Sequence, residues 1–284
     1  MFYTTIAKLG LKKQDRTSKA PAMVRNYFNK AINKAALLAI RGKKISGAIT
    51  IWEGPSEFDG TPIKVVMTGY IKDSENEKTG PLVQVFILPS DEKPINAFKA
   101  KKSSVCGDCI YNGGGCYVNW GRLTPTWSAS KRKFISLELA SWLVTGLRVR
   151  LGAAGDPSAV PTYVWETLLK GADSWTGYTH SWKNCDPALR RIVMASCDND
   201  DETKQAISLG WNVFHVHDGK IDDNIDYVRC LSGSPDSNGL PKTCFSCMMC
   251  HGVRSSKARP LVVAEKLHGS TATLSQARKA RKIS

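Results

Sequence analysis

The sequence of 284 residues lacks long hydrophobic runs, and no segment approaches the roughly 20 apolar residues that a membrane-spanning helix needs. Its first residues, MFYTTIAKLGLKKQ, also lack the apolar core of about 7–15 residues found in signal peptides. We therefore expect no membrane partner and a cytoplasmic protein. Because the cytoplasm keeps thiols reduced, we expect the nine cysteines to be metal ligands or reactive thiols.

Acidic residues are scarce at both ends of the chain. Residues 1–46 contain 11 Lys and Arg but one acid, Asp15, and residues 253–284 contain 8 but one acid, Glu265. The net charge of +15 therefore belongs to the ends, and the middle is near neutral. Basic arms suit contact with the phosphate backbone of nucleic acid, which we predict as a partner of the basic termini. Solvated tails that only increase solubility are the alternative.

Hydrophobic periodicity predicts a helix in residues 20–44, followed by strands. The apolar residues expected to form the buried face of this helix recur every three or four positions: Val24, Phe28, Ile32, Ala35 and Ala39. Residues 47–90 change to the β-branched runs GAITIW, IKVVMTGYI and LVQVFIL, which predict three strands. Residues 91–102 read as a polar connector.

Between residues 134 and 218, helical and strand patterns alternate. The strand patterns are LRVRLGA, WTGYTH, RRIVMAS and WNVFHV. Such alternation predicts an α/β fold, either a partial (β/α) barrel or an open parallel sheet. In these folds the chemistry gathers at the carboxyl ends of the strands, where Gly155, Asp156 and His180 fall. Asp156 and His180 are therefore candidates for ligand contact, the alternatives being a simple turn and a buried, hydrogen-bonded histidine.

These patterns divide the chain into four parts. Residues 1–46 form a basic N-terminal helical arm, and residues 47–102 a β-rich extension. Residues 103–252 form a metal-binding α/β domain with a cysteine cluster at each end, the second in a C-terminal cap. Residues 253–284 hold the last strand and a basic tail, of which residues 270–284 are expected to be helical at most in part.

The second cluster has the spacing Cys244-x2-Cys247-x2-Cys250, with Cys230 upstream. Thiolates bind soft metals, and a C-x2-C-x2-C run matches the start of the bacterial ferredoxin spacing. The spacing therefore favours an iron–sulfur cluster, which Cys230 would close as the fourth ligand. Structural zinc is the alternative.

The first cluster is Cys106-x2-Cys109-x6-Cys116 in a glycine-rich loop, followed by Tyr117. Three thiolates with no fourth nearby suit a metal site with an open position, which a reactive centre requires. The alternative is a zinc site closed at long range by a histidine, Cys185 or Cys197.

Two weaker patterns could also bind metal. His215-Val216-His217 places two imidazoles on one face of a strand, as in the metal half of rolling-circle nicking enzymes, but the helix with the catalytic tyrosine is missing. Four acids near the start of a predicted helix could bind Mg²⁺ or simply favour the helix dipole: Asp198, Asp200, Asp201 and Glu202.

Five segments together resemble an uncharacterised family of phage and prophage proteins and, more distantly, the phage gene product 88 family. They are Cys106-Gly107-Asp108-Cys109, Gly115-Cys116-Tyr117-Val118-Asn119, Gly155-Asp156-Pro157, Gly177-Tyr178-Thr179-His180-Ser181-Trp182 and Met194-Ala195-Ser196-x-Asp198. With the closing cysteine run, the resemblance covers roughly residues 80–252. Through these families the chain looks similar to radical S-adenosylmethionine enzymes, which are partial (β/α) barrels.

This resemblance implies a [4Fe–4S] cluster on the first three cysteines, an auxiliary cluster on the last four, and S-adenosylmethionine as a cofactor. Residues of the cofactor site would be Cys106, Cys109, Cys116, Tyr117, Gly155 and Asp156. Radical enzymes usually space the first three cysteines as C-x3-C-x2-C, so a site that keeps only a metal is an alternative. The rival to an enzyme is a metal-stabilised nucleic-acid-binding protein in phage replication or host takeover.

Overall fold

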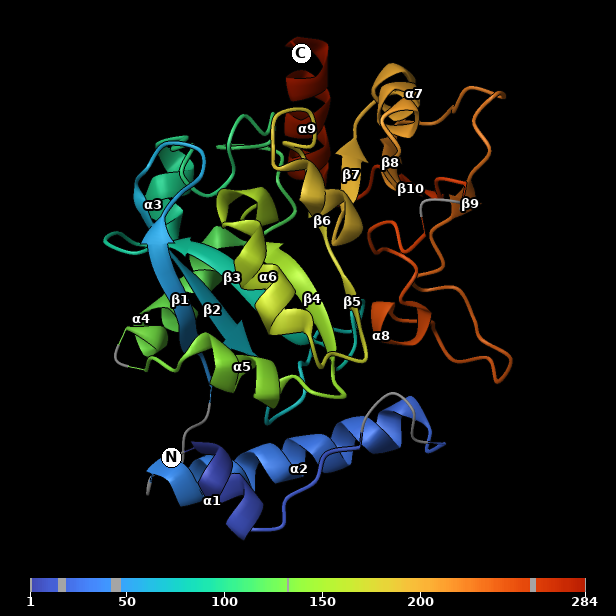
Figure 1. Ribbon diagram of the computed structural model, residues 1–284. Coiled ribbons are helices and arrows are strands. Elements are labelled where there is room, and N and C mark those ends of the chain that lie inside the picture. Colours follow the sequence, from blue (N-terminus) through green and yellow to red (C-terminus); the bar gives the residue numbers. More distant parts are fainter. Residues whose placement is uncertain (1, 15–18, 42–46, 132, 256–258, 284) are drawn as a thin grey trace.

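Two five-stranded sheets organise the fold in a computed structural model, which describes residues 2–14, 19–41, 47–131, 133–255 and 259–283 (Figure 1). The first sheet has the order β1 (Ile49–Pro55), β2 (Pro62–Thr68), β3 (Val83–Pro89), β4 (Arg148–Ala154) and β5 (Ser174–Thr176). The second has the order β6 (Tyr178–Thr179), β7 (Met194–Cys197), β8 (Val213–His217), β10 (Val262–Lys266) and β9 (Val228–Arg229).

Helices connect and cover the sheets. The α-helices are α1 (Phe2–Lys8), α2 (Ala22–Arg41), α3 (Pro94–Lys99), α4 (Thr124–Ser130), α5 (Leu137–Leu143), α6 (Thr162–Leu169), α7 (Asp200–Ser208), α8 (Cys244–Cys247) and α9 (Thr271–Ile283). Three short 3-10 helices follow at Trp120–Leu123, Pro157–Ala159 and Pro187–Arg191. In Figure 1 the two ends of the chain lie at opposite ends of the molecule, α1 and α2 at the bottom and α9 at the top.

Strand direction confirms the predicted α/β class. Strands β1, β2 and β3 pair antiparallel, as hairpin-connected β-branched runs do, whereas β3, β4 and β5 pair parallel. Every pairing in the second sheet is parallel. No pairing among the described strands closes a barrel, so the open sheet is the observed architecture. Because β3 pairs with β4, the predicted β-rich extension and the α/β segment share one sheet.

The run WTGYTH, predicted as one strand, is divided between the two sheets at Gly177. A Cβ at this position would lie 2.8 Å from Cγ1 of Val193 and 3.1 Å from Cβ of Leu151. The chain therefore passes from one sheet to the other at a point where only glycine avoids crowding by these neighbours. The end of β6 lies beside the turn that follows β4, where the hydroxyl of Thr179 donates to that of Ser158 at 3.1 Å.

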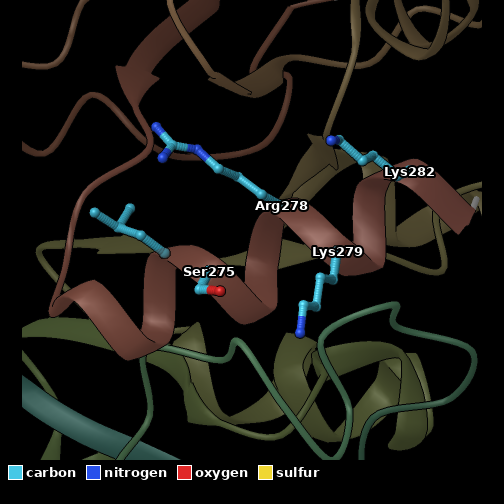
Figure 2. A pocket seen from close by; sticks show the side chains of 5 residues that line it. Ser275, Arg278, Lys279 and Lys282 are labelled. Atoms are coloured by element: carbon cyan, nitrogen blue, oxygen red, sulfur yellow. The ribbon is translucent and has the colours of Figure 1, made fainter.

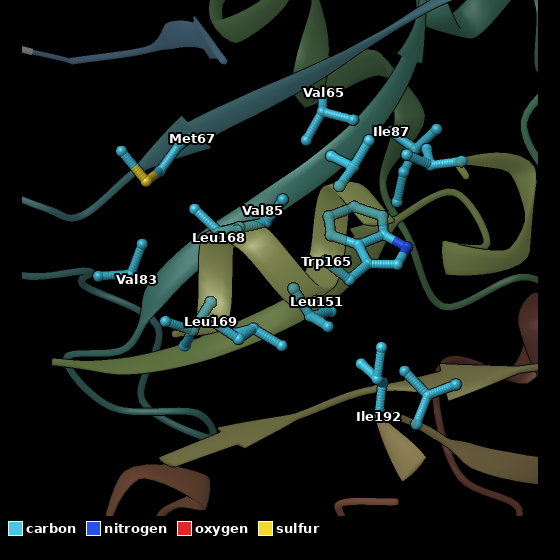
Figure 3. Close-up of a cluster of buried hydrophobic side chains, with 14 of the residues drawn as sticks. Val65, Met67, Val83, Val85, Ile87, Leu151, Trp165, Leu168, Leu169 and Ile192 are labelled. Atoms are coloured by element: carbon cyan, nitrogen blue, oxygen red, sulfur yellow. The ribbon is translucent and has the colours of Figure 1, made fainter. Parts of the chain in front are cut away.

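The core lies between the first sheet and α6. Figure 3 shows Trp165, Leu168 and Leu169 of α6 among the strand residues, including Val85 and Leu151. Trp165 is fully buried, and its indole N–H donates to the carbonyl of Pro157 at 2.8 Å. This bond satisfies the one polar group of the largest core side chain and fixes the turn that follows β4.

The buried face predicted for the helix in residues 20–44 is wrong. Val24 and Phe28 are exposed, and the helix instead buries Asn29 and Asn33. Asn33 donates to the carbonyls of Tyr70 and Leu143, and Asn29 donates to those of Gln14 and Gly146. The helix packs over chain turns whose carbonyls need donors, so amide side chains face inward where an apolar face would leave those carbonyls unsatisfied.

Two further segments differ from expectation. The polar connector 91–102 contains the short helix α3, and the basic tail 270–284 forms the helix α9 over nearly its whole length. None of the helices within the described ranges is both long and apolar enough to cross a membrane.

Candidate metal centres

The loop that carries the first cysteine site, defined as Cys106, Cys109 and Cys116, is a series of tight turns. The amide of Cys109 donates to the carbonyl of Cys106 at 3.2 Å, and Gly107 and Gly113 adopt positive φ angles of 52° and 85°. The amide of Asp156 donates to the carbonyl of Val105 at 2.7 Å, which ties the loop to the end of β4. Short glycine turns therefore hold the three thiols at the carboxyl edge of the sheet.

Burial raises the thiol pKa of two of the three cysteines, Cys106 and Cys116. It raises the pKa of Cys106 well above its usual range, and the negative charges of Cys109, Cys116 and Asp156 raise it further. Burial likewise raises the pKa of Cys116, whose sulfur accepts a hydrogen bond from the amide of Val118 at 3.4 Å. The charges of Cys109 and Cys116 act on Cys106, and that of Cys109 acts on Cys116, so the three thiols lie within electrostatic reach of one another. Burial disfavours the anionic forms of Cys106 and Cys116.

His180, at the end of β6, is brought to this site. Its side chain hydrogen-bonds the thiol of Cys109, and its Nε2 lies 3.8 Å from Oδ2 of Asp198. Burial alone would lower its pKa, but the charges of Cys109, Asp198 and Asp156 outweigh burial and raise the pKa of His180 to about 10. The imidazole of His180 therefore places a nitrogen that can bind metal in contact with the first cysteine site.

Asp156 lies beside the same site but uses both carboxylate oxygens within the protein. Its Oδ1 accepts from the amide and hydroxyl of Ser158, and its Oδ2 accepts from the amide of His180 at 2.8 Å. Its side chain is buried. Asp156, which we predicted to contact a ligand, thus positions His180 and the turn after β4. It lies next to the thiol of Cys106.

A second polar cluster adjoins the first cysteine site, and sequence analysis missed most of it. The hydroxyl of Tyr111 donates to Asp198 at 2.6 Å, and Arg281 of α9 contacts both residues, at 2.8 Å and 3.2 Å. A Cβ on Gly115 would lie 2.8 Å from the backbone nitrogen of Ala277, so α9 lies directly on the cysteine loop. Only Asp198 had a sequence signal, its position after a strand.

Two other predicted cofactor residues lie at the margins of the site. Tyr117 is half exposed, and its hydroxyl accepts from the amide of His268 while the two rings stack. Gly155 has a φ of 77°, and a Cβ there would lie 2.5 Å from the carbonyl oxygen of Ile87. Tyr117 therefore contacts the end of β10, and Gly155 allows a close backbone approach.

The second cysteine site, defined as Cys230, Cys244, Cys247 and Cys250, lies in the cap around α8. Burial raises the pKa of Cys250 to about 12, and the charges of the other three cysteines contribute. Burial also raises the pKa of Cys230 to about 11. The four cysteines that sequence spacing grouped therefore interact with one another in space.

Backbone contacts anchor the second cysteine site to three separate parts of the fold. The amide of Cys230 donates to Ala264 of β10, that of Cys244 donates to Lys78, and the carbonyl of Cys250 accepts from Gly177. The side chains of Tyr178 and Cys250 also share a hydrogen bond. The cysteine-bearing segments thus attach the cap to the rest of the fold. Within the described residues of the cap, little of the chain is helix or strand.

The two remaining cysteines have other neighbours. Cys197 is fully buried on β7, and burial together with Glu202 and Asp198 raises its thiol pKa. Cys185 lines a surface cavity of about 350 Å³ near Pro161 and Leu189, and burial and Asp156 raise its thiol pKa to about 12. The charges that act on these two thiols are those of carboxylates and, for Cys197, of Lys183, and not those of the clustered cysteines.

The chemistry of the donor sets fits soft metals, since all nine cysteines are free thiols. Within the described residues, however, no three His, Cys, Asp or Glu side chains are gathered closely enough to hold a single metal ion.

Comparisons of this chain with protein-family models, curated proteins and solved structures found no match.

Proposed function

We propose that this is a phage-type iron–sulfur protein with two clusters, acting in the cytoplasm of an infected or lysogenic host cell. Cys106, Cys109 and Cys116 would hold a reactive [4Fe–4S] cluster. The four cysteines of the cap would hold an auxiliary cluster. The observation that carries the proposal is the position of the first cysteine loop, since it is tied to the carboxyl end of β4 and contacts His180 after β6.

The first site has three thiolate donors, which leave one iron of a cubane cluster for another ligand. Such a cluster supplies an electron, and in the radical enzymes that the sequence resembles it cleaves S-adenosylmethionine reductively. Around it, Asp156 orients the backbone of His180, and Arg281 neutralises Asp198. The chain's own residues thus provide charged and polar groups beside the thiols, with α9 packed on the cysteine loop.

Formation of 5′-deoxyadenosine tests this activity. Anaerobic protein with reductant and S-adenosylmethionine should release 5′-deoxyadenosine and methionine, and Cys106→Ala should abolish release while the fold persists. The matched control is Cys185→Ala, which removes a thiol outside both cysteine sites. A wild-type protein that contains iron but releases neither product would contradict the enzymatic assignment.

A second candidate function is a non-catalytic, metal-stabilised nucleic-acid-binding protein. The specific observation in its favour is the contact of His180 with Cys109, because an imidazole can be the fourth ligand of a closed Cys₃His site. His180→Gln discriminates between the two functions. An open reactive cluster keeps its metal in this variant, whereas a closed site loses metal and thermal stability.

In this second candidate function, fewer basic residues would be available to contact nucleic acid than the number of Lys and Arg at the two ends indicates. Arg25, Lys30, Arg278 and Arg281 form ion pairs with acids of the protein. On α9, Figure 2 shows Lys279 and Lys282 projecting from the helix beside Arg278, where they line a shallow pocket. These two exposed lysines are the best remaining candidates for phosphate contact on α9.

A further inference from the structure

Two histidines outside both cysteine sites lie on β8, and one of them has an unusual environment. His215 is 1% exposed, and its Nδ1 lies 2.8 Å from the hydroxyl oxygen of Thr203. That hydroxyl also donates to the carbonyl of Asn199 at 3.0 Å. With the single hydroxyl hydrogen on the carbonyl of Asn199, Nδ1 of His215 donates its own hydrogen to Thr203. A neutral His215 then carries a bare lone pair on Nε2.

This lone pair lies beside a carboxylate. Nε2 of His215 is 3.3 Å from Oδ1 of Asp200, the first residue of α7, and neither buried atom has a hydrogen-bond partner among the described residues. The other carboxylate oxygen, Oδ2, accepts from the amide of Asp222 at 3.1 Å, which fixes the carboxylate plane. Two atoms with lone pairs repel each other when no hydrogen lies between them. In a buried place this contact is unfavourable unless a cation lies between the two atoms.

The separation fits coordination. Two ligands that each lie roughly 2.1 Å from one ion are about 3 Å apart, close to the distance between these two atoms. His217 follows on the same face of β8, and its ring is parallel to that of His215, with centroids 6.0 Å apart. Its Nδ1 accepts a long hydrogen bond of 3.3 Å from the amide of Gly219. Breaking this single weak bond would let the ring turn toward the other two groups.

We propose that His215 Nε2 and Asp200 Oδ1 bind a divalent first-row transition metal of the Mn²⁺ and Fe²⁺ class, with His217 turning in as the third ligand. Two imidazoles and one carboxylate on one side of an ion leave its other positions to water or substrate. No thiol belongs to this donor set, so the ion differs from those expected at the cysteine sites. The site needs a small movement of His217, since no three side chains are already gathered around one point in the described chain.

The proposed metal site is connected to the first cysteine site through Arg281. The residue between the two histidines, Val216, gives its carbonyl to Arg281 at 2.8 Å, and Arg281 in turn pairs with Asp198 beside His180. The metal would therefore lie on the neighbouring strand of the same carboxyl edge. The inference does not depend on the clusters, because its ligands come from α7 and β8 alone.

Binding of Mn²⁺, measured by loss of the free-ion electron paramagnetic resonance signal, tests the proposal on the full-length protein. Wild type should bind about one Mn²⁺ per chain, and Asp200→Asn should weaken binding more than about 100-fold. His217→Ala should weaken it about tenfold, because it removes the ligand that must move. The matched control is Asp201→Asn, which removes a neighbouring exposed acid from the same helical turn and should bind like wild type.

Asp200 is one-third exposed, so Asp200→Asn should fold normally, which circular dichroism checks. Cys106→Ala should bind Mn²⁺ like wild type, which separates this proposal from the iron–sulfur proposal. Absence of Mn²⁺ binding in wild type, or equal affinity in wild type and Asp200→Asn, would overturn the proposal. The contact between His215 and Asp200 would then be one in which a neutral imidazole carries its hydrogen on Nε2, facing the carboxylate.

Discussion

The two cysteine sites use the same donor atoms in different surroundings. The first lies where regular strands end, and carboxylates, an arginine and a histidine surround its loop. The second lies in a cap with little regular structure, where the half-buried Tyr178 is hydrogen-bonded to one thiol and backbone bonds link the cysteine-bearing segments to the body. The first site thus has chemical groups that could act on a bound molecule. The contacts of the second site mainly attach the cap to the rest of the protein.

This difference indicates what each metal would contribute to the protein. A cluster that joins segments of irregular chain adds its binding free energy to folding, because no other large core holds those segments. Among the described residues, the hydrophobic cluster of the cap has three buried members, Leu82, Phe245 and Met248. The first cysteine loop, in contrast, is attached to the main core through β4. We therefore expect the second site to be structural and the first to be functional.

The largest expected effect is the loss of a cap ligand. Cys247→Ser should cost about 4 kcal/mol of unfolding free energy, the range for a lost structural metal, and lower the melting temperature by about 10 °C. Its matched control is Cys106→Ser, which changes the same atom at the first site and should cost far less. Differential scanning calorimetry under anaerobic conditions measures both variants. Equal losses would remove the distinction between a structural and a functional site.

A smaller effect is expected at the contact between α9 and the first site. Arg281→Ala removes the cation that contacts both Asp198 and Tyr111 in a mostly buried place, so we expect α9 to detach and its amides to exchange about 100-fold faster. Hydrogen exchange followed by mass spectrometry measures this.

The control for this variant lies one turn earlier on the same helix. Arg278 pairs with Asp218 at an exposed position, so Arg278→Ala should change the exchange rate of α9 by less than about fivefold. If the two variants give equal exchange rates, the Arg281 contacts do not hold α9 on the cysteine loop.

The smallest expected effect concerns nucleic acid. The double variant Lys279→Glu and Lys282→Glu should bind single- or double-stranded nucleic acid about tenfold more weakly at low salt, with a shallower dependence of log affinity on log salt. Lys170→Glu with Lys220→Glu makes the same change of charge on exposed residues outside the basic ends and should have little effect. Equal affinities in a fluorescence titration would assign the charge of α9 to solubility.

Local patterns predicted the strands and grouped the cysteines because these features depend on neighbours in the sequence. The β-branched runs of residues 47–90 form β1, β2 and β3, and short cysteine spacings mark sites whose members interact. The inward face of α2 could not be predicted, because Asn33 bonds carbonyls of Tyr70 and Leu143 that are distant in sequence. The contact of Arg281 with Asp198 joins residues 83 positions apart and leaves no local pattern.

Iron and acid-labile sulfide per chain, measured on anaerobically purified protein, test the central claim of two independent clusters most directly. Two [4Fe–4S] clusters would give about eight irons and eight sulfides in wild type, and about four of each in Cys106→Ala and in Cys247→Ser. Stoichiometric zinc without sulfide in wild type would contradict the account. So would a Cys106→Ala protein that loses all its iron, because the two sites would then not be independent.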